Sequence, residues 1–391
     1  MENFIEEDKE FIANTYGRFN VVIKEGHGST FVDVNGKEYI DFGSGIGTNS
    51  FGVSDEEWVK AVVEQAKTVQ HTSNLYYSLP QIKLAKLLCE KTGMKKVFFA
   101  NSGAESNECA IKTARKYSFD KYGKGRSEII TLVNSFHGRT ICTLSATGQD
   151  VFHNYFFPFV EDFKYCPAND IEALKNLISD KTCAIMIETV QGEGGVNALN
   201  ADFIKFIDKV CKEKDILFIV DEVQTGNGRC GYLYSYMEYG VEPNIVTTAK
   251  GLAGGLPFGA ILFDEKTKPV LGAGQHGTTF GGNPVCASAA YSILTRLNDD
   301  LFNHVKECRK YLENKLKDVK EIKSISGKGM MVGIELPEGV NAKDVAVKCM
   351  ENGLIPLTAK TKIRLLPPLN ITIEELDRGL DILIKSIKEC I

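Results

Sequence analysis

Two stretches of the sequence carry side chains that could do chemistry together. The first is an apolar run, residues 216–220, that ends in Asp221 and Glu222. The second is a β-prone run, residues 244–248, which is followed by Lys250. Apolar runs of this length without alternation are typical of strands buried on both faces, as in a parallel sheet. Ligands bind at the carboxyl ends of such strands, so we expect Asp221 and Lys250 to share one crevice.

An acid and a lysine at one edge of a sheet are the two groups that pyridoxal 5′-phosphate (PLP) requires from a protein. The lysine amine forms a Schiff base with this cofactor, and the acid keeps the pyridine nitrogen protonated. Each residue also has an ordinary explanation, because a lysine after a strand is usually solvated and an Asp-Glu pair often caps a helix. Other segments of the chain are needed to decide between the two explanations.

A predicted strand, residues 96–100, leads into a helix through Ser102, Gly103 and Ala104. Free amides at a helix N-terminus bind an anion such as a phosphate, and a small residue lets the ligand approach the backbone. An ordinary Ser-Gly turn would also explain the segment. The pattern predicts a phosphate site only in combination with the other motifs.

The loop after the predicted strand 129–133 contains Phe136 and Arg139. Phe136 offers a flat face on which an aromatic cofactor could stack. Arg139 offers a planar fork that can bind a carboxylate through two hydrogen bonds. The alternative for Arg139 is a surface charge without a ligand.

Three more segments carry polar side chains at positions where a site could form. Glu193 lies among glycines after the predicted strand 184–188, and a later glycine-rich loop supplies Thr278 and Thr279. Arg364 stands within a short apolar strand. A buried arginine is rarely left unpaired, so Arg364 implies a carboxylate partner or a ligand.

The order of the predicted elements indicates an α/β fold with two domains. From residue 96 to about 264, strands, loops and helices alternate, which indicates a mainly parallel sheet with helices on both faces. After residue 285 the order of predicted elements changes and indicates a smaller α+β domain. An N-terminal hairpin with its turn at Asn35 and Gly36 completes this domain. The predicted division is an N-terminal segment of the small domain at 1–50, a large PLP-binding domain at 51–285 and a C-terminal small domain at 286–391.

Two capping boxes mark the predicted starts of helices in both parts of the chain. One is the run from Ser54 to Glu57, and the other consists of Thr372 and Glu375. In such a box the first hydroxyl accepts from the backbone three residues later, where a glutamate reaches back. We therefore expect a helix after each.

Composition and charge exclude several classes of protein. The 391 residues carry a formal net charge of −5, which argues against a general binder of nucleic acid or anionic membranes. No apolar run approaches the roughly 18 residues that span a membrane. The acidic residues 1–8 lack the features of a signal peptide, and the eleven cysteines contain no C-x-x-C pair. The six histidines are scattered. We expect a cytoplasmic protein with reduced thiols and no metal site.

Taken together, these segments resemble the class III aminotransferases, PLP enzymes of fold type I, over nearly the whole chain. Four segments resemble in particular those family members that act on N2-acetyl-L-ornithine. They are residues 14–19, 44–46, 136–140 and 191–195. One stretch departs from the family pattern. Members usually have Gly-His-x-His-Pro where this chain has Gly-Val-Ser-Asp-Glu at 52–56, which puts only the local loop structure in doubt. The resemblance implies a large domain with a mainly parallel seven-stranded sheet and a smaller α+β domain formed by both termini.

The resemblance also implies a role for each motif residue. Lys250 would hold PLP and move the proton, Asp221 would pair with the pyridinium nitrogen, and Gln224 would reach the phenolic oxygen. Phe136 and Val223 would pack on the two faces of the ring. The predicted phosphate ligands are Ser102, Gly103 and Ala104, together with Thr279 of a neighbouring subunit, with Thr278 beside it. Active sites would therefore lie at the interface of a homodimer.

For the reaction, the resemblance implies transfer of the terminal amino group of N2-acetyl-L-ornithine to 2-oxoglutarate, a step of arginine biosynthesis. The products would be N-acetyl-L-glutamate 5-semialdehyde and L-glutamate. Arg139 would bind the carboxylate of the acetylated donor, and Arg364 the α-carboxylate of glutamate. Glu193 would pair with Arg364 when no such carboxylate is present. Tyr16 is the remaining predicted substrate residue.

Other donors and other classes remain open on the sequence alone. Ornithine, succinylornithine and 4-aminobutyrate are rival donors. Ile46 counts against free ornithine because ornithine-specific relatives carry an aromatic there, whereas the Tyr16 hydroxyl counts in its favour. A PLP aminomutase of the same fold is disfavoured by the pair of Arg139 and Arg364, which suits a dicarboxylate. A non-catalytic binding protein would not need Lys250, and a nicotinamide dehydrogenase would need a G-x-G-x-x-G that is missing.

Overall fold

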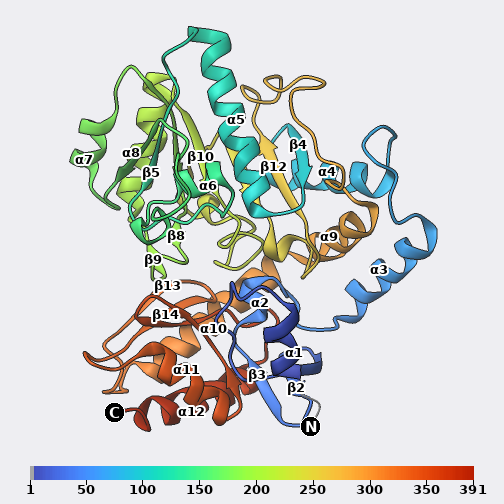
Figure 1. Ribbon diagram of the computed structural model, residues 1–391, viewed down its shortest axis with the longest axis vertical. Coiled ribbons are helices and arrows are strands. Elements are labelled where there is room, and N and C mark those ends of the chain that lie inside the picture. The colour runs from blue at the N-terminus through green and yellow to red at the C-terminus, as the bar shows by residue number, and fades with distance from the viewer. Residues whose placement is uncertain (1–3) are drawn as a thin grey trace.

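The computed structural model of the protein describes residues 4–391, so residues 1–3 of the predicted small domain lie outside the described residues. Its largest element is a seven-stranded sheet in the order β4-β12-β11-β10-β7-β5-β6 (Figure 1). All strands run parallel except β12, which is antiparallel to both of its neighbours. The predicted seven-stranded, mainly parallel sheet is thus confirmed. The strands are β4 (Lys96–Ala100), β5 (Glu128–Leu132), β6 (Phe163–Cys166), β7 (Thr182–Ile187), β10 (Leu217–Asp221), β11 (Ile245–Thr248) and β12 (Gly259–Phe263).

The central strand β10 is buried on both faces, as its unbroken apolar run predicts. Leu217 and Ile219 pack in one cluster with residues of helix α5 (Gly103–Tyr122). Phe218 and Val220 pack in another cluster with residues of helix α8 (Ala201–Lys214). Alternate residues of one strand therefore bury their side chains under helices on opposite faces of the sheet.

Further helices complete the layers around this sheet. Helices α3 and α4 both pack against α9, next to β4. Among the helices of residues 4–391, none combines the length and the apolar character needed to cross a membrane. The further helices around the large sheet are α3 (Glu56–Thr68), α4 (Leu79–Thr92), α6 (Ile141–Ala146), α7 (Ile171–Leu177) and α9 (Pro284–Arg296).

Two four-stranded sheets lie below the large sheet in Figure 1, where both ends of the chain also lie. One has the order β1-β2-β3-β15 and pairs the C-terminal strand β15 in parallel with the N-terminal strand β3, with Leu354 opposite Ile40. This pairing confirms that both termini build the smaller unit. The other has the order β13-β14-β17-β16. The strands are β1 (Ile23–His27), β2 (Thr30–Asp33), β3 (Glu38–Asp41), β13 (Ser324–Lys328), β14 (Met331–Glu335), β15 (Leu354–Ile355), β16 (Leu357–Ala359) and β17 (Lys362–Leu365).

Helices α10 (Asp299–Leu316), α11 (Ala342–Glu351) and α12 (Ile373–Lys388) cover these sheets. The predicted capping box of α12 forms, because Thr372 accepts from the amide of Glu375 and the Glu375 side chain accepts in return. The box predicted at Ser54 is wrong by one residue. Asp55 caps α3 by accepting from the amide of Trp58, while Ser54 adopts a positive φ of 56°. A carboxylate also suits the positive end of the helix dipole.

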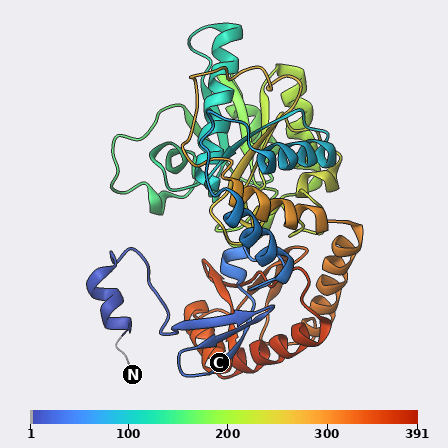
Figure 2. The ribbon, with the colours of Figure 1, turned by 90° about the vertical axis from the view of Figure 1, so that its right-hand side faces the viewer.

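The N-terminal helix α1 (Phe4–Phe11) stands away from both units in Figure 2. None of its residues is buried, and Phe11 is 76% exposed. An amphipathic helix without a hydrophobic surface to cover has little stability of its own in water. Helix α1 and the exposed residues 12–18 that follow it form an N-terminal arm. The apolar face of α1 is free to pack against a further surface.

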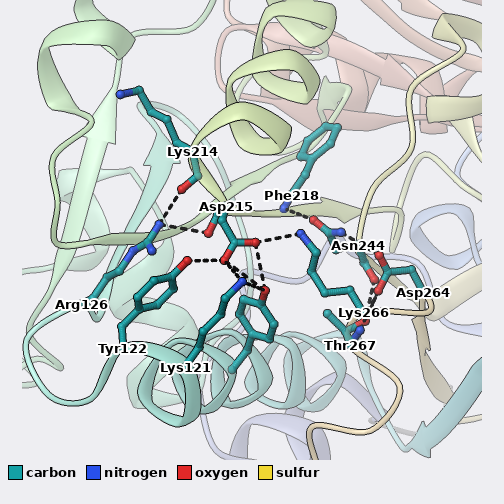
Figure 3. Close-up of polar contacts among 11 residues, drawn as sticks. Lys121, Tyr122, Arg126, Lys214, Asp215, Phe218, Asn244, Asp264, Lys266 and Thr267 are labelled. Carbon is teal, nitrogen blue, oxygen red and sulfur yellow. Dashed lines mark hydrogen bonds and ion pairs between the residues drawn. The ribbon is translucent and has the colours of Figure 1, made fainter.

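A cluster of ion pairs and hydrogen bonds lies at the amino end of β10 (Figure 3). Its centre is Asp215, which caps α8 two residues before β10 begins. Its carboxylate accepts from Lys121 at 2.8 Å, Lys266 at 3.0 Å and Tyr117 at 3.0 Å, and from Tyr122. Burial acts against ionisation of Asp215, but these donors outweigh it and lower its pKa well below the usual range.

A buried arginine joins the large sheet to the C-terminal sheet. Arg229 follows β10 in the chain and is 3% exposed. Its guanidinium donates to the carbonyls of Met330 at 3.2 Å and of Pro367. Because Met330 precedes β14 and Pro367 follows β17, this contact sets the C-terminal sheet over the carboxyl ends of the large sheet's strands.

Candidate active site

A cavity of about 400 Å³ opens at the carboxyl ends of β10 and β11. Residues from both strand ends, from the first turn of α5 and from the loop after β5 line it together. Nine of the predicted site residues line it: Ser102, Gly103, Ala104, Phe136, Arg139, Asp221, Val223, Gln224 and Lys250. The structure therefore brings together residues that are up to about 150 positions apart in the sequence.

Asp221 is the last residue of β10 and is held in place at the bottom of the cavity. It is 3% exposed. One carboxylate oxygen accepts from the side-chain amide of Asn107 at 2.7 Å and lies 2.8 Å from Nδ1 of His137. The other oxygen accepts from the backbone amide of Val223 at 3.0 Å. A carboxylate with this many partners keeps one orientation and is well suited to hold a proton-bearing ring nitrogen.

Glu222, the second acid of the predicted pair, points away from the cavity. It is fully buried and accepts from the hydroxyls of Thr225 and Ser235, each at 2.6 Å, and from the amide of Tyr236. Successive side chains at a strand end point in opposite directions, which explains the different fates of the two acids. Glu222 is thus a structural residue.

Lys250 opens a short 3-10 helix, η3 (Lys250–Leu252), directly after β11 and lines the cavity. Its φ of 43° is in the left-handed region, which is uncommon for a residue with a side chain. Burial lowers the pKa of the Lys250 amine, and the negative charge of Glu193 opposes this effect. A lowered pKa raises the fraction of neutral amine, which is the nucleophilic form.

The first turn of α5 forms one wall of the cavity. Ser102 caps the helix by accepting from the amide of Glu105 at 3.1 Å. The amides of Gly103 and Ala104 lie in the first turn, where the helix itself offers no acceptor. A Cβ on Gly103 would lie 2.6 Å from a methyl group of Val223, so only glycine lets Val223 pack on this turn. The wall is chemically suited to bind an anion.

A buried acid that we did not predict as a site residue holds two of the predicted loops together. Glu188, directly after β7, accepts from the amide of Phe136 at 2.9 Å and from that of Gly192 at 3.3 Å. Burial raises the pKa of Glu188 to about 7. In the sequence, the only sign that Glu188 could hold these loops is its position at the end of a buried strand. His137 and Asn107, which hold Asp221, lie inside motifs that we identified, but neither was predicted as a site residue.

Arg364 and Glu193 form an ion pair beside the cavity. Nη1 of Arg364 donates to Glu193 at 2.6 Å and to the side-chain oxygen of Gln224 at 3.1 Å. The Gln224 amide nitrogen lies 3.4 Å from the same Glu193 oxygen. Burial alone would raise the pKa of Glu193, but the charge and hydrogen bond of Arg364 outweigh burial and lower it. Glu193 is therefore ionised at neutral pH.

Besides Glu193 and Arg364, three further predicted residues do not line this cavity, namely Thr278, Thr279 and Tyr16. Thr278 is near it, since its hydroxyl accepts from Asn101 at 2.9 Å. Thr279 is exposed on the surface. Tyr16 belongs to the N-terminal arm, is 74% exposed and has Arg18 over its ring. The roles of these three in substrate or cofactor binding stay predictions.

The residues of the cavity fit PLP. A buried amine of lowered pKa, an anchored carboxylate, an aromatic face and the free amides of a helix N-terminus match the aldehyde, ring nitrogen, ring and phosphate of that cofactor. The fold and the site together define a PLP enzyme of the doubly wound α/β type.

The comparisons with known proteins agree with this class. The model of the class-III aminotransferases matches residues 11–387. The chain is 49% identical to the acetylornithine aminotransferase of Haemophilus ducreyi, over 98% of each chain. The structure of the ornithine aminotransferase from Toxoplasma gondii has a TM-score of 0.94 at 31% identity and covers 99% of this chain and 94% of its own. For the N-acetylornithine aminotransferase of Stenotrophomonas maltophilia the TM-score is 0.86 at 31% identity, with 98% of each chain covered.

The chain belongs to the class-III aminotransferase family. It is accordingly a transaminase, and its cofactor is PLP.

Proposed function

We propose that this enzyme transfers the terminal amino group of N2-acetyl-L-ornithine to 2-oxoglutarate, as predicted from the sequence. The observation that carries the proposal is the pair of Arg364 and Glu193 at 2.6 Å beside a cavity that also has Arg139 at its rim. A transaminase with a dicarboxylate acceptor needs two sites that bind a carboxylate. A donor that reacts through a terminal amine has no carboxylate near the cofactor, so the arginine of that site needs another anionic partner while the donor is bound. The 49% identity to the Haemophilus enzyme supports the same donor.

The cofactor would be held by the residues that match its groups. Lys250 would form the covalent link, Asp221 would receive a hydrogen bond from the ring nitrogen, and the amides of Gly103 and Ala104 would bind the phosphate. When bound, PLP supplies an electron sink that stabilises the carbanion left when the substrate carbon loses its proton. Because Asp221 is fixed by Asn107 and His137, it can keep the ring nitrogen protonated without reorganising.

In the first half-reaction, Arg139 would bind the carboxylate of acetylornithine and leave the terminal amine free to reach the cofactor. Lys250, once released from the cofactor, would carry the proton from the substrate carbon because its lowered pKa allows the neutral amine to act as a base. Glu193 would stay on Arg364, so that the methylene chain of the donor does not face an unpaired cation.

In the second half-reaction, 2-oxoglutarate would bring a carboxylate to each arginine. Its α-carboxylate would displace Glu193 from Arg364, and its distal carboxylate would bind Arg139. Glycines at 192, 194 and 195 flank Glu193 and give its loop the freedom to withdraw. Gln224, which contacts both members of the pair, would keep the Arg364 fork aligned during the exchange.

Free ornithine is the strongest rival donor. The Toxoplasma structure has a high TM-score, but its 31% identity is well below the 49% of the Haemophilus relative. Ile46 is exposed and lies in a left-handed turn with a φ of 64°. It offers no hydroxyl or aromatic face for the α-amino group of ornithine. The other predicted alternatives are succinylornithine or 4-aminobutyrate as the donor and a PLP aminomutase. The steady-state kinetics described at the end of this subsection test them together with free ornithine.

We also propose that the enzyme works as a cytoplasmic homodimer. Leu75, Tyr76 and Tyr77 are 86%, 71% and 97% exposed, and Phe280 is 60% exposed. The segment around them is continuous with the loop of Thr279, because Asn74 donates to the carbonyl of Gly281 at 2.8 Å. Exposed apolar residues in this number mark a protein interface. Sedimentation should then give twice the chain mass of 43.2 kDa, and a monomer would contradict the proposal.

Steady-state kinetics would test the donor. With 2-oxoglutarate as acceptor, kcat/KM should be highest for acetylornithine when it is compared with ornithine, succinylornithine and 4-aminobutyrate. Formation of glutamate in equal amount to the semialdehyde would confirm transamination. A donor consumed without 2-oxoglutarate and converted to an isomer would instead identify an aminomutase, and a higher kcat/KM for another donor would replace acetylornithine.

A further inference from the structure

The guanidinium of Arg139 lies against two aromatic rings at the rim of the cavity. Its central carbon lies 4.2 Å from the ring centroid of Phe152 and 5.6 Å from that of Phe136. The two rings meet edge to face, with centroids 5.9 Å apart and planes at 70°. Within residues 4–391, no carboxylate lies within ion-pair distance of Arg139. Of the two rings, Phe152 is the closer to the guanidinium, so its face restrains this exposed side chain.

Stacking restrains an arginine while leaving its hydrogen-bond donors free. The five N–H groups of a guanidinium lie in its plane, whereas an aromatic ring contacts its face. A carboxylate that approaches in the plane can still accept two parallel hydrogen bonds. An unrestrained arginine loses rotamer freedom when it binds, so a stacked one binds a carboxylate at a lower entropic cost.

Phe152 is itself anchored to the strand end that carries Phe136 and Arg139. It ends the 3-10 helix η1 (Asp150–Phe152), and its amide donates to the carbonyl of Gln149 at 3.0 Å. The buried Gln149 side chain donates to the carbonyl of Ser135, and the Ser135 hydroxyl accepts from Gly148, both at 3.0 Å. The backbone that carries the ring of Phe152 is thus tied to the cavity wall.

We propose that Phe152 is a positioning residue for the substrate carboxylate, acting through Arg139. Its ring holds the guanidinium at the cavity rim with the donor edge free for the carboxylate of acetylornithine and for the distal carboxylate of 2-oxoglutarate. This inference rests on the proposed function, in which Arg139 binds those carboxylates. The apolar ring makes no contact with the reacting atoms, so its effect falls on binding and not on the chemical step.

The test is to replace Phe152 in the holoenzyme and to measure KM and kcat for both substrates. Phe152→Leu removes the aromatic face and should raise KM for acetylornithine and for 2-oxoglutarate by about 2- to 30-fold, with kcat at saturation nearly unchanged. Phe152→Tyr keeps the face and should retain the wild-type KM. Phe156→Leu is the matched control, because Phe156 lies in the same loop, is 54% exposed and meets the ring of Tyr155 edge to face instead of contacting Arg139.

A double-mutant cycle separates this inference from the proposed function. In an Arg139→Met background, Phe152→Leu should change neither KM, because the side chain that it positions is gone. A further rise in KM in that background, or a Phe152→Tyr variant as impaired as Phe152→Leu, would overturn the positioning role. If Arg139→Met itself leaves both KM values unchanged, the carboxylate site of the proposed function is wrong, and the inference falls with it. If Arg139→Met raises KM and Phe152→Leu does not, only the inference is wrong.

Discussion

Nη1 of Arg364 donates to Oε1 of Glu193 at 2.6 Å, and this contact links strand β17 of the C-terminal sheet to the glycine-rich turn between strands β8 (Val190–Gln191) and β9 (Asn197–Ala198). Arg364 is 3% exposed, so its charge is costly unless it has a partner. Glu193 is that partner when no substrate is present. In the proposed function, any ligand that places a carboxylate at the same point would compete directly with Glu193, and the pair would select between substrates of different charge.

The covalent link to the cofactor can be tested at Lys250. Borohydride treatment of the holoenzyme should attach the cofactor irreversibly to Lys250, since its amine is the buried amine of lowered pKa in the cavity. Lys250→Ala should still bind PLP through the remaining contacts but should not turn over. Peptide mapping by mass spectrometry gives the labelled residue. A label on any other lysine would contradict the assignment.

Arg139→Lys should weaken the binding of both substrates although the charge is kept. A lysine offers a point charge instead of a planar fork, so one of two parallel hydrogen bonds is lost, and so is the stacking on Phe152. Loss of a charged hydrogen bond corresponds to about 1.5–3 kcal/mol, or roughly 10- to 150-fold in kcat/KM. Steady-state kinetics with each substrate varied in turn would measure it. Unchanged values for both would remove Arg139 from the site.

The sequence was enough to predict the large sheet and nine residues of the cavity, for a physical reason. Buried parallel strands have unbroken apolar runs, and ligand residues follow their carboxyl ends, so Asp221 and Lys250 are visible as interruptions of a simple pattern. The predicted division of the chain at residues 50 and 285 stays a prediction. At the departure from the family pattern, residues 52–56, Val53 and Gly28 exchange two backbone hydrogen bonds at 2.8 Å.

Contacts between loops could not be predicted in the same way. Glu188 holds the amides of Phe136 and Gly192, and Phe152 stacks on Arg139, but neither relationship follows a periodic pattern in the sequence. They depend on how loops from different strands meet after the sheet has formed. The place of Tyr16 was also invisible, because an exposed arm has no buried face that would fix its course.

Asp215→Asn should lower the stability of the protein without lowering its activity. Asparagine tolerates the left-handed conformation of this residue, which has a φ of 50°, so the change removes chiefly the charge that Lys121 and Lys266 pair with. We expect a loss of about 1–2 kcal/mol in urea unfolding, because the lysines are partly exposed and screened. Asp120→Asn is the matched control on α5, whose surface pair with Lys116 should contribute less than about 0.5 kcal/mol.

The same cluster predicts a pH dependence. The pKa of Asp215 is lowered in the folded protein, so its stabilising effect is complete above the unfolded value of about 3.9 and is lost as the pH falls below it. The wild-type protein should therefore lose more stability than Asp215→Asn between about pH 5 and pH 3. Parallel losses in the two proteins would show that Asp215 does not contribute through its charge.

The claim that one cavity serves two substrates through Glu193 is tested most directly by following each half-reaction of Glu193→Ala alone in a stopped-flow instrument. Without Glu193, Arg364 stays open, so the rate with acetylornithine should fall while the rate with glutamate is kept or rises. Glu193→Gln, which keeps the size but not the charge, should lie between Glu193→Ala and the wild type. Equal losses in both half-reactions, or a loss with glutamate alone, would contradict the account.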